Sequence, residues 1–433
     1  MSSTSPSAPA ALLLHRVLDE VGAGDRLEPP SPALRVPLPS RLDTGGLAWA
    51  SVAAVASTAG IRGPLDPDRI ALSYRSDRVL EVDGAAPSVW SPLSGFWRTS
   101  DGWVRTHGNY PHHAERLLRG LDIASHPERL GDALSERTTA EAVHAVNSVG
   151  GLIAEVSRET PLRDAALRET PVVDVRALAA TVGDLPRRGS LPLEGIRVLD
   201  FTRVIAGPVC TRTLALLGAD VLRIDPPGLA EPEWQHLDTG HGKRSAVLDS
   251  GSSAMTDLLG EAHVVVLGYR PASVARLGLS PESLAERHPG LVIAQLSAWG
   301  VDEPERRGFD SLVQAESGIA MVESPDGTRP GVLPAQALDH GAGYLLAASV
   351  LALLERRRVD GGTWIARTSL RRIAAELLGL PRRSQPDVER IADPAPHTAV
   401  FDVGGRDLRT VRPALPGFEF RAPHPWGGDQ PRW

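Results

Sequence analysis

Apolar residues in the second half of the chain form short continuous runs, and stretches with a helical pattern lie between them. The expected strands cover 196–201, 219–225, 263–269, 291–297 and 362–370. The stretch from Pro208 to Gly218 has the proline start and glycine stop typical of a helix. Strands alternating with helices predict an α/β fold with a doubly wound parallel sheet, a Rossmann-like large domain whose ligands bind beyond the carboxyl ends of the strands.

The first 182 residues show a mixed pattern. We expect an apolar helix over 43–60, a hairpin over 94–108 that turns at Asp101-Gly102, and a helix and strand over 138–156. These elements predict a smaller α+β domain. The predicted divisions are a loosely ordered N-terminal segment 1–40, the small domain 41–182, a linker 183–195, the large domain 196–379 and a Pro-rich C-terminal wrap 380–433.

Composition narrows the class of protein. With 433 residues, 42% hydrophobic and 23% charged, the chain has room for two or three globular domains. The formal net charge of −7 argues against a nucleic-acid partner. No run of 18 apolar residues and no secretory signal are recognisable, so no membrane association is expected. The single cysteine, Cys210, excludes an internal disulfide framework and suits a cytoplasmic location.

Asp339 stands at the start of a long apolar stretch, 333–358, that predicts a helix. The unpaired N–H groups of a helix N-terminus favour the anionic form of a carboxyl group there. We expect Gly331, Gly341 and Gly343 to leave its approach uncrowded. An ionised, reachable carboxylate can act as a covalent nucleophile, although a plain helix N-cap explains the same residue.

Basic residues and a short loop gather at the predicted strand ends. The loop 204–207 precedes a helix N-terminus, a geometry that receives phosphate or carbonyl groups, but it lacks a dinucleotide fingerprint. Lys243, Arg244, Arg270 and Arg276 lie close to strand ends. Each alone is an ordinary surface charge, whereas several on one rim favour a polyanionic ligand.

Other side chains give weaker signals. His107, His112 and His113 lack an acidic residue at ligand spacing, so no metal site is expected. A G-x-S-x-G motif is absent, which leaves a serine hydrolase without support. The aromatic residues that could line a substrate pocket, or simply pack in a core, are Trp90, Phe96, Trp97 and Trp103.

Five blocks in order over residues 193–370 resemble the class III CoA-transferase family, which includes formyl-CoA and carnitine CoA-transferases and alpha-methylacyl-CoA racemases. They are "LEGIRVLDFTRVIAGPVCTRTLALLGADVLRIDPP", "GKRSAVLD", "VVVLGYRPASVARLGL", "RRGFDSLVQAESGIA" and "ALDHGAGYLLAASVLALLERR". The resemblance implies that Asp339 is a nucleophile that exchanges CoA between an acyl-CoA and a small carboxylic acid. It further implies CoA contacts from Val204, Ile205, Ala206, Arg223, Lys243, Tyr269, Arg270 and Arg276.

The chain also departs from the family pattern. Phe309 stands where the racemases carry a histidine base, which disfavours racemisation and makes the adjacent Asp310 a helix-capping candidate. The segments that resemble the small domain precede the large one, which implies a permuted or fused order. Family members form interlocked dimers, so a homodimer is the corresponding expectation. A CoA-thioester isomerase or racemase, or a non-catalytic CoA-binding protein, remain the alternatives.

Overall fold

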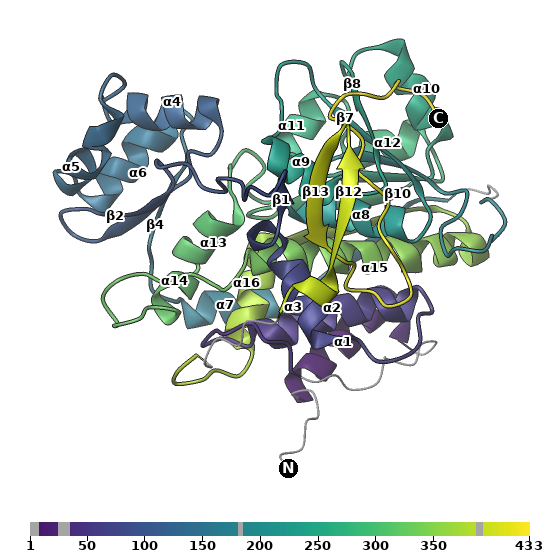
Figure 1. The fold of residues 1–433 in the computed structure, drawn as a ribbon, viewed down its shortest axis with the longest axis horizontal. Coiled ribbons are helices and arrows are strands. Elements are labelled where there is room, and N and C mark those ends of the chain that lie inside the picture. Colours follow the sequence, from purple (N-terminus) through teal and green to yellow (C-terminus); the bar gives the residue numbers. More distant parts are fainter. Residues whose placement is uncertain (1–7, 25–34, 181–184, 387–392) are drawn as a thin grey trace.

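The computed structural model describes residues 8–24, 35–180, 185–386 and 393–433. Its centre is a seven-stranded sheet in the order β5-β11-β10-β9-β6-β7-β8 (Figure 1). The strands are β5 (Asp174–Ala179), β6 (Arg197–Phe201), β7 (Asp220–Asp225), β8 (Arg244–Val247), β9 (Val264–Leu267), β10 (Val292–Ser297) and β11 (Thr363–Ser369). All neighbours pair in parallel except β5, which pairs antiparallel with β11 at one edge. The predicted α/β fold is therefore confirmed.

The central strands are rich in buried apolar residues because both faces of the sheet are covered. Val198 and Val264 point into one core, and their neighbours Leu199 and Val265 point into another. The first face packs against α8 (Ala206–Leu216), α15 (Ala337–Asp360) and α16 (Leu370–Gly379), and the second against α10 (Ser253–Glu261), α11 (Pro271–Arg276) and α12 (Pro281–Arg287). This burial on both sides explains the continuous apolar runs in the sequence.

Helix α15 is the central helix of the first face. Its length and a mean hydropathy of 1.5 would suffice to cross a membrane, but 94% of its most apolar window is buried inside the protein. Helix α2 (Thr44–Thr58) packs along it and is itself buried on nearly every side. The two helices form the interior of the layer that covers this face of the sheet.

The N-terminal segment departs from the prediction. Residues 8–20, expected to be loosely ordered, form helix α1 (Ala8–Glu20), which packs on α2. Leu14, Val17 and Leu18 are almost fully buried, because they form an apolar stripe that the surrounding Ser, Pro and Ala residues obscure in the sequence. The remaining predicted segments 1–7 and 25–34 lie outside the described residues.

The small domain is narrower than 41–182. Its own core is built around Val104, Leu117 and Val146. It contains β2 (Gly95–Arg98), β3 (Trp103–Thr106), β4 (Ile153–Glu155), α4 (Pro111–Gly120), α5 (Leu130–Ser135) and α6 (Thr139–Ser148), on the left of Figure 1. The predicted hairpin and the helix followed by a strand are present. Helices α2, α3 (Pro67–Tyr74) and α7 (Pro161–Arg168) instead pack with the large domain.

The linker and the C-terminal wrap also have more structure than expected. Residues 185–195 connect β5 to β6, two strands of one sheet, and residues 181–184 lie outside the described part of the chain. In the wrap, β12 (Thr398–Val403) and β13 (Arg406–Val411) form a small sheet with β1 (Glu81–Val82). The tail then reaches β8, where the Asp429 carboxylate accepts from the Ser245 N–H at 2.7 Å.

Candidate functional site

A cleft of about 490 Å³ opens beyond the carboxyl ends of the parallel strands, and Asp339 lies in its wall. Val204 and Ala206 follow β6, and Tyr269 and Arg270 follow β9. Other lining residues come from the ends of β10 and β11. The cleft is therefore where the sheet type predicts a ligand site.

A second, smaller pocket of about 30 Å³ meets the cleft at Asp339. Val204, Phe309 and Asp339 line both cavities. The small pocket is otherwise walled largely by aromatic and amide side chains, among them Trp90, His107, Asn109, Trp234, Gln235 and Gln336. Asp339 thus stands between a large cleft and a small pocket.

Asp310 caps the helix that carries Asp339. Its Oδ2 accepts from the N–H groups of Leu338 and Asp339 at 2.9 and 3.0 Å, and its Oδ1 accepts from the Gln314 amide at 2.5 Å. Asp310 begins α13 (Asp310–Glu316), so it caps α15 across the fold and not its own helix. Burial raises the pKa of Asp310 to about 6, although these hydrogen bonds oppose the shift.

The Asp339 carboxyl group is not stabilised as an anion in the way the sequence predicts. Burial and the neighbouring Asp310 raise its pKa well above the usual range. The N–H groups expected to favour its charge are already hydrogen-bonded to Asp310. A buried carboxylate stripped of water is a stronger base and nucleophile than an exposed one.

These raised pKa values give a pH prediction. Because the folded protein holds protons on Asp339 and Asp310 that the unfolded chain releases near pH 4, their contribution to stability is complete below about pH 4 and falls as the pH rises. We expect Asp339→Asn to match the wild type in melting temperature at pH 4 and to exceed it increasingly up to pH 8. A constant difference between the two proteins across that range would contradict the raised pKa of Asp339.

The glycines near Asp339 serve helix packing and not ligand access. A Cβ on Gly343 would lie 2.5 Å from the Ala206 carbonyl oxygen, and one on Gly341 would contact Leu47 of α2 at 3.5 Å. Gly331 similarly lies against the Glu323 backbone. The expectation that these glycines clear a path to Asp339 is wrong. Gly343 instead lets the start of α8 approach α15, which brings the 204–206 loop beside Asp339.

Val204 has a strained backbone. Its φ is +73°, and among the described non-glycine residues only Asp83 and Asp122 share a positive φ. A β-branched residue in the left-handed region is a true outlier, at a cost on the order of 1–3 kcal/mol. Since Val204 lines both cavities next to Asp339, the strain lies in the site itself.

Arginines surround the cleft. Arg116, Arg203, Arg270 and Arg307 line it. Partial burial and the neighbouring Arg307 and Arg276 lower the pKa of Arg270, and burial together with Arg116 lowers that of Arg307. Cations that repel one another in a half-buried site are stabilised by an anionic ligand. Two of the four also face a carboxylate, because Arg270 pairs with Glu305 at 3.2 Å and Arg203 lies 3.8 Å from Glu231. The cleft is therefore rich in cations, and two of them, Arg116 and Arg307, face it with no ion pair among the described residues.

Of the predicted CoA contacts, Val204, Ala206, Tyr269 and Arg270 line the cleft, and Ile205 lines the small pocket. The other three predicted contacts, Arg223, Lys243 and Arg276, do not line the cleft, and each pairs with an acidic residue. Lys243 is buried with its Nζ 3.0 Å from Asp200, and burial lowers its pKa to about 8. Arg276 is exposed and pairs with Glu305 at 2.5 Å.

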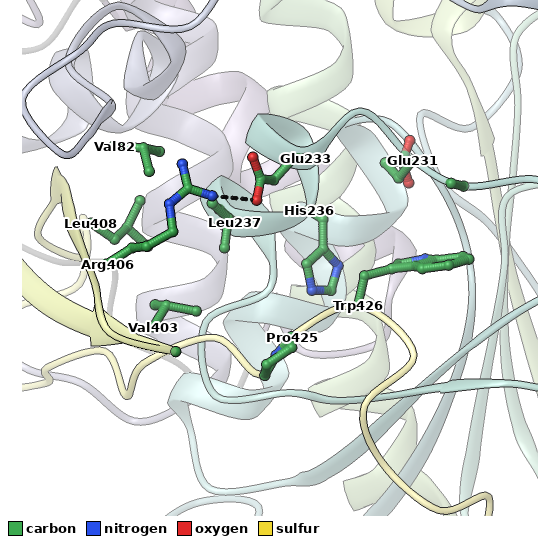
Figure 2. Close-up of a pocket in the computed structure, with 12 residues that line it drawn as sticks. Val82, Glu231, Glu233, His236, Leu237, Val403, Arg406, Leu408, Pro425 and Trp426 are labelled. Atoms are coloured by element: carbon green, nitrogen blue, oxygen red, sulfur yellow. Dashed lines mark hydrogen bonds and ion pairs between the residues drawn. The ribbon is translucent and has the colours of Figure 1, made fainter.

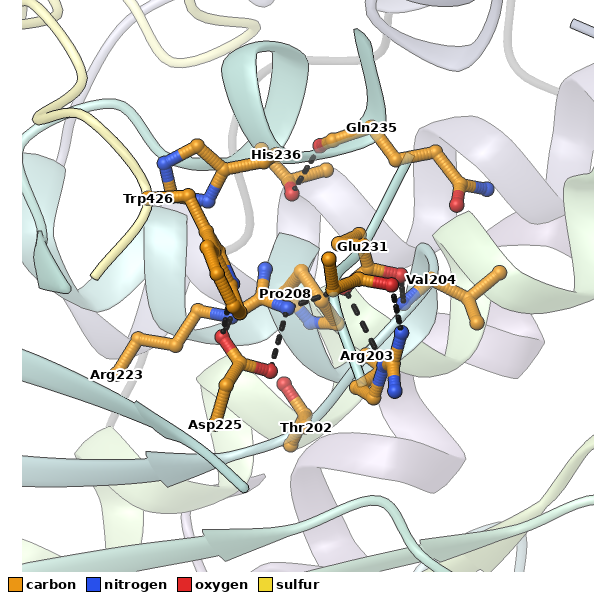
Figure 3. Close-up of polar contacts among 12 residues, drawn as sticks. Thr202, Arg203, Val204, Pro208, Arg223, Asp225, Glu231, Gln235, His236 and Trp426 are labelled. Carbon is orange, nitrogen blue, oxygen red and sulfur yellow. Dashed lines mark hydrogen bonds and ion pairs between the residues drawn. The ribbon is translucent and has the colours of Figure 1, made fainter. Parts of the chain in front are cut away.

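Arg223 belongs to a buried polar network (Figure 3). It pairs with Asp225 at 2.8 and 3.0 Å and with Glu231. Glu231 Oε1 accepts from the Val204 N–H at 3.2 Å, and Asp225 accepts from the indole of Trp426 at 3.0 Å. Neither the CoA role predicted for Arg223 nor that for Lys243 fits this burial.

A third pocket, of about 360 Å³, lies behind this network between α9 (Glu233–Thr239) and β12–β13 (Figure 2). Glu231, His236 and Trp426 form one side of it. Arg406 and Glu233 pair at 2.7 Å on another side. Asp339 does not line this pocket, so it is separate from the site.

The small domain contributes residues that the sequence did not assign to the site. Tyr110, His112, His113 and Arg116 line the cleft, and His107 stacks on Phe309 at 3.9 Å between ring centroids. Burial lowers the pKa of His107 to about 3 and that of His113 to about 2. Among the described residues no group of three or more His, Cys, Asp or Glu side chains could hold a metal ion. Arg203 also lines the cleft. Its place directly before the predicted loop 204–207 is a sequence signal that could have assigned it to the site.

Residues 193–381 match the model of CoA-transferase family III. This region contains Asp339 and the strand ends that form the cleft. This part of the chain is therefore similar to CoA-transferase family III. The family domain thus includes the sheet, α15 and the large-domain wall of the site, whereas the small domain lies before it in the chain.

Two curated relatives share about half their length with this chain. A probable fatty acyl-CoA transferase of Mycobacterium tuberculosis is 34% identical over 207 residues, 43% of this chain and 52% of the relative. A formyl-CoA:oxalate CoA-transferase of Rhodopseudomonas palustris is 31% identical over 186 residues, 39% of this chain and 44% of the relative. A crystal structure of a hypothetical protein from M. tuberculosis aligns at 34% identity with a TM-score of 0.41, over 44% of this chain and 58% of that one.

Proposed function

We propose that this protein is a family III acyl-CoA:carboxylate CoA-transferase with Asp339 as its nucleophile. The observation that carries the proposal is the place of Asp339, a buried carboxyl group where an arginine-lined cleft meets a small pocket. The cleft suits the phosphates of CoA, with contacts from Val204, Ala206, Tyr269 and Arg270. The carboxylic acid is proposed to bind beside Asp339, where the two cavities meet.

The first half of the proposed reaction removes the donor acid. Once its proton has been lost to solvent, the Asp339 carboxylate attacks the thioester carbonyl, the C–S bond breaks, and CoA leaves as a thiolate, so that a mixed anhydride joins Asp339 to the acyl group. The thiolate then attacks the Asp339 carbonyl of the anhydride and displaces the donor carboxylate. Asp339 now carries CoA as a thioester, so the covalent intermediates divide one difficult exchange into several easier steps.

The second half reverses these steps with the acceptor. The acceptor carboxylate attacks the Asp339 thioester and releases the thiolate, which attacks the acceptor side of the new anhydride. The products are the new acyl-CoA and a free Asp339 carboxylate. Ile205, the N-cap of α8, gives no side-chain cap, so the first N–H groups of α8 are the proposed donors to the oxyanions. Gly341 faces Leu47 and is not proposed for that role.

An isotope-exchange experiment tests this function. The protein is incubated with a panel of acyl-CoAs and carbon-labelled free acids, and CoA thioesters are analysed by mass spectrometry. Label in new thioesters is expected. With an acceptor labelled by ¹⁸O in its carboxylate, the mechanism also transfers one ¹⁸O per turnover to the Asp339 carboxyl group, detectable in the peptide that contains it. Exchange without ¹⁸O in that peptide would overturn the role of Asp339.

Arg270→Gln is expected to raise the KM for the acyl-CoA by about tenfold with little change in kcat, because one charge-assisted contact of roughly 1.5 kcal/mol to the nucleotide is lost. The matched control is Arg244→Gln. Arg244 pairs with Asp220 at 2.9 Å at the opposite, amino end of the sheet. Steady-state kinetics measure KM for the acyl-CoA in both variants. An equal change of KM in the two would show that Arg270 does not contact the acyl-CoA.

A second candidate function is proton transfer at the α-carbon of a CoA thioester. One observation favours it: His107 from the small domain stacks on Phe309 in the pocket of Asp339 and could stand in for the missing histidine. A pKa of about 3 makes that imidazole a poor base at neutral pH, which favours the transferase. Deuterium uptake at the α-carbon without acyl exchange in the same assay would favour proton transfer over CoA transfer.

A further inference from the structure

Glu231 is a fully buried carboxylate that touches both walls of the cleft. Its Oε1 accepts from the Val204 N–H at 3.2 Å and from the Tyr110 hydroxyl at 2.5 Å. Its Oε2 pairs with Arg223 and lies 3.8 Å from Arg203. Burial acts to raise its pKa, but Arg223 and Arg203 outweigh burial and lower it, so Glu231 is an anion.

Each neutral partner of Glu231 belongs to a different domain. Val204 lies in the loop between β6 and α8 in the large domain and lines both cavities beside Asp339. Tyr110 is the N-cap of α4 in the small domain and lines the cleft. The Arg203 guanidinium lies over the Tyr110 ring, 5.1 Å from its centroid, and its Nη2 donates to the Ala230 carbonyl at 2.9 Å. One carboxylate therefore bonds to both sides of the site, and Figure 3 shows its contacts on the large-domain side with Arg203 and Val204.

The strained backbone at Val204 needs such a restraint. An L residue with a branched side chain leaves a φ of +73° unless the surrounding structure holds it there. The hydrogen bond from the Val204 N–H to a charged acceptor is such a restraint, because bonds to ionised groups are stronger than neutral ones. In its absence, the loop would relax and change the shape of the cleft at Asp339.

We propose that Glu231 is a positioning residue: its carboxylate holds Val204 in the left-handed conformation, and through Tyr110 it docks the small domain on the same loop. The shape of the cleft beside Asp339 and the seating of the small domain are then set by one side chain. The kinetic part of this inference rests on the proposed transferase function. The conformational part does not.

A rescue experiment tests it. Glu231→Ala is expected to lower kcat by about thirtyfold with a smaller change in KM. If Glu231 acts by imposing the left-handed backbone, adding Val204→Gly to Glu231→Ala should raise kcat at least tenfold, since glycine adopts that conformation freely. The matched control adds Val204→Ala to Glu231→Ala. Alanine also has a shorter side chain than valine but disfavours a positive φ, so kcat should stay as low as in Glu231→Ala alone. Equal recovery with Gly and Ala, or recovery with neither, would overturn the proposal.

Hydrogen exchange separates this inference from the transferase assignment. In the wild type the amide of Val204 is expected to be protected. Glu231→Ala should speed its exchange at least tenfold, and Tyr110→Phe, which removes only the hydroxyl, should speed exchange in the segment 107–116 without unfolding the protein. These readouts need no substrate, so they decide the inference even where transfer is undetectable. Unchanged exchange at Val204 in Glu231→Ala would refute it, and Tyr110→Phe keeps the test available where Glu231→Ala does not fold.

Discussion

Asp339→Asn is expected to abolish CoA transfer, lowering kcat by about a thousandfold or more. The amide has nearly the size of the carboxylate but cannot attack a thioester or form the anhydride. The four arginines of the cleft remain in place, so CoA should bind nearly as tightly as in the wild type. Transfer is measured by the exchange of labelled acid, and binding by calorimetry with CoA.

The control for this prediction is Asp326→Asn. Asp326 is an exposed turn residue that accepts from the N–H groups of Thr328 and Arg329 at 2.9 Å, away from both cavities. Its replacement should leave kcat unchanged. Undiminished transfer by Asp339→Asn would exclude the covalent mechanism, whereas loss of both transfer and CoA binding would show that Asp339 supports the cleft and not the chemistry.

Lys243→Ala is expected to destabilise the fold by about 3–5 kcal/mol, because it leaves the Asp200 carboxylate buried without its cation. The ammonium group of Lys243 also donates to the Pro208 carbonyl at 3.0 Å, next to the start of α8. Asp200 further accepts from the hydroxyls of Thr202 and Thr211, at 2.5 and 2.6 Å. Denaturant unfolding of the variant measures the loss.

The double variant Lys243→Met/Asp200→Asn removes both charges and should recover a large part of that stability. This pattern distinguishes a structural ion pair from a CoA contact. If Lys243→Ala kept its stability and bound CoA more weakly, the resemblance would be right about Lys243, and the burial described above would be misleading about its role.

The main sheet could be predicted because its strands are buried on both faces. Continuous apolar runs such as 263–269 and 291–297 leave little choice but parallel strands between helices. The edge strand β5 was missed because its residues are half-buried or exposed and include Asp174 and Arg176. Helix α1 was missed for the opposite reason, since Ser and Pro around it dilute a short apolar stripe.

The sequence predicted where the candidate site lies but not the charges and hydrogen bonds that surround its residues. The helix start located Asp339, yet its raised pKa depends on Asp310, which reaches the same helix terminus from another element. Arg223 and Lys243 look like free cations at strand ends. Their acidic partners become visible only when the strands and the segment before α9 are placed in space. Sequence spacing does not show which face a charge occupies.

The permuted order does not remove the small domain from the site. The resemblance left open whether a small domain that precedes the large one still reaches the cleft. Tyr110, His113 and Arg116 of this same chain line it beside Asp339. Both domains therefore line the candidate site, and the family match, which begins at residue 193, includes only one of them.

The pairing of α2 with α15 has a consequence for how the protein is made. Helix α2 is apolar on nearly every side, and its cover, α15, emerges from the ribosome only after most of the chain has been translated. Until then the N-terminal helices present apolar surface with no partner, a state prone to aggregation. Contacts so distant in sequence also slow folding. We therefore expect the yield of native protein to depend on chaperones and on the rate of synthesis more strongly than its final stability would suggest.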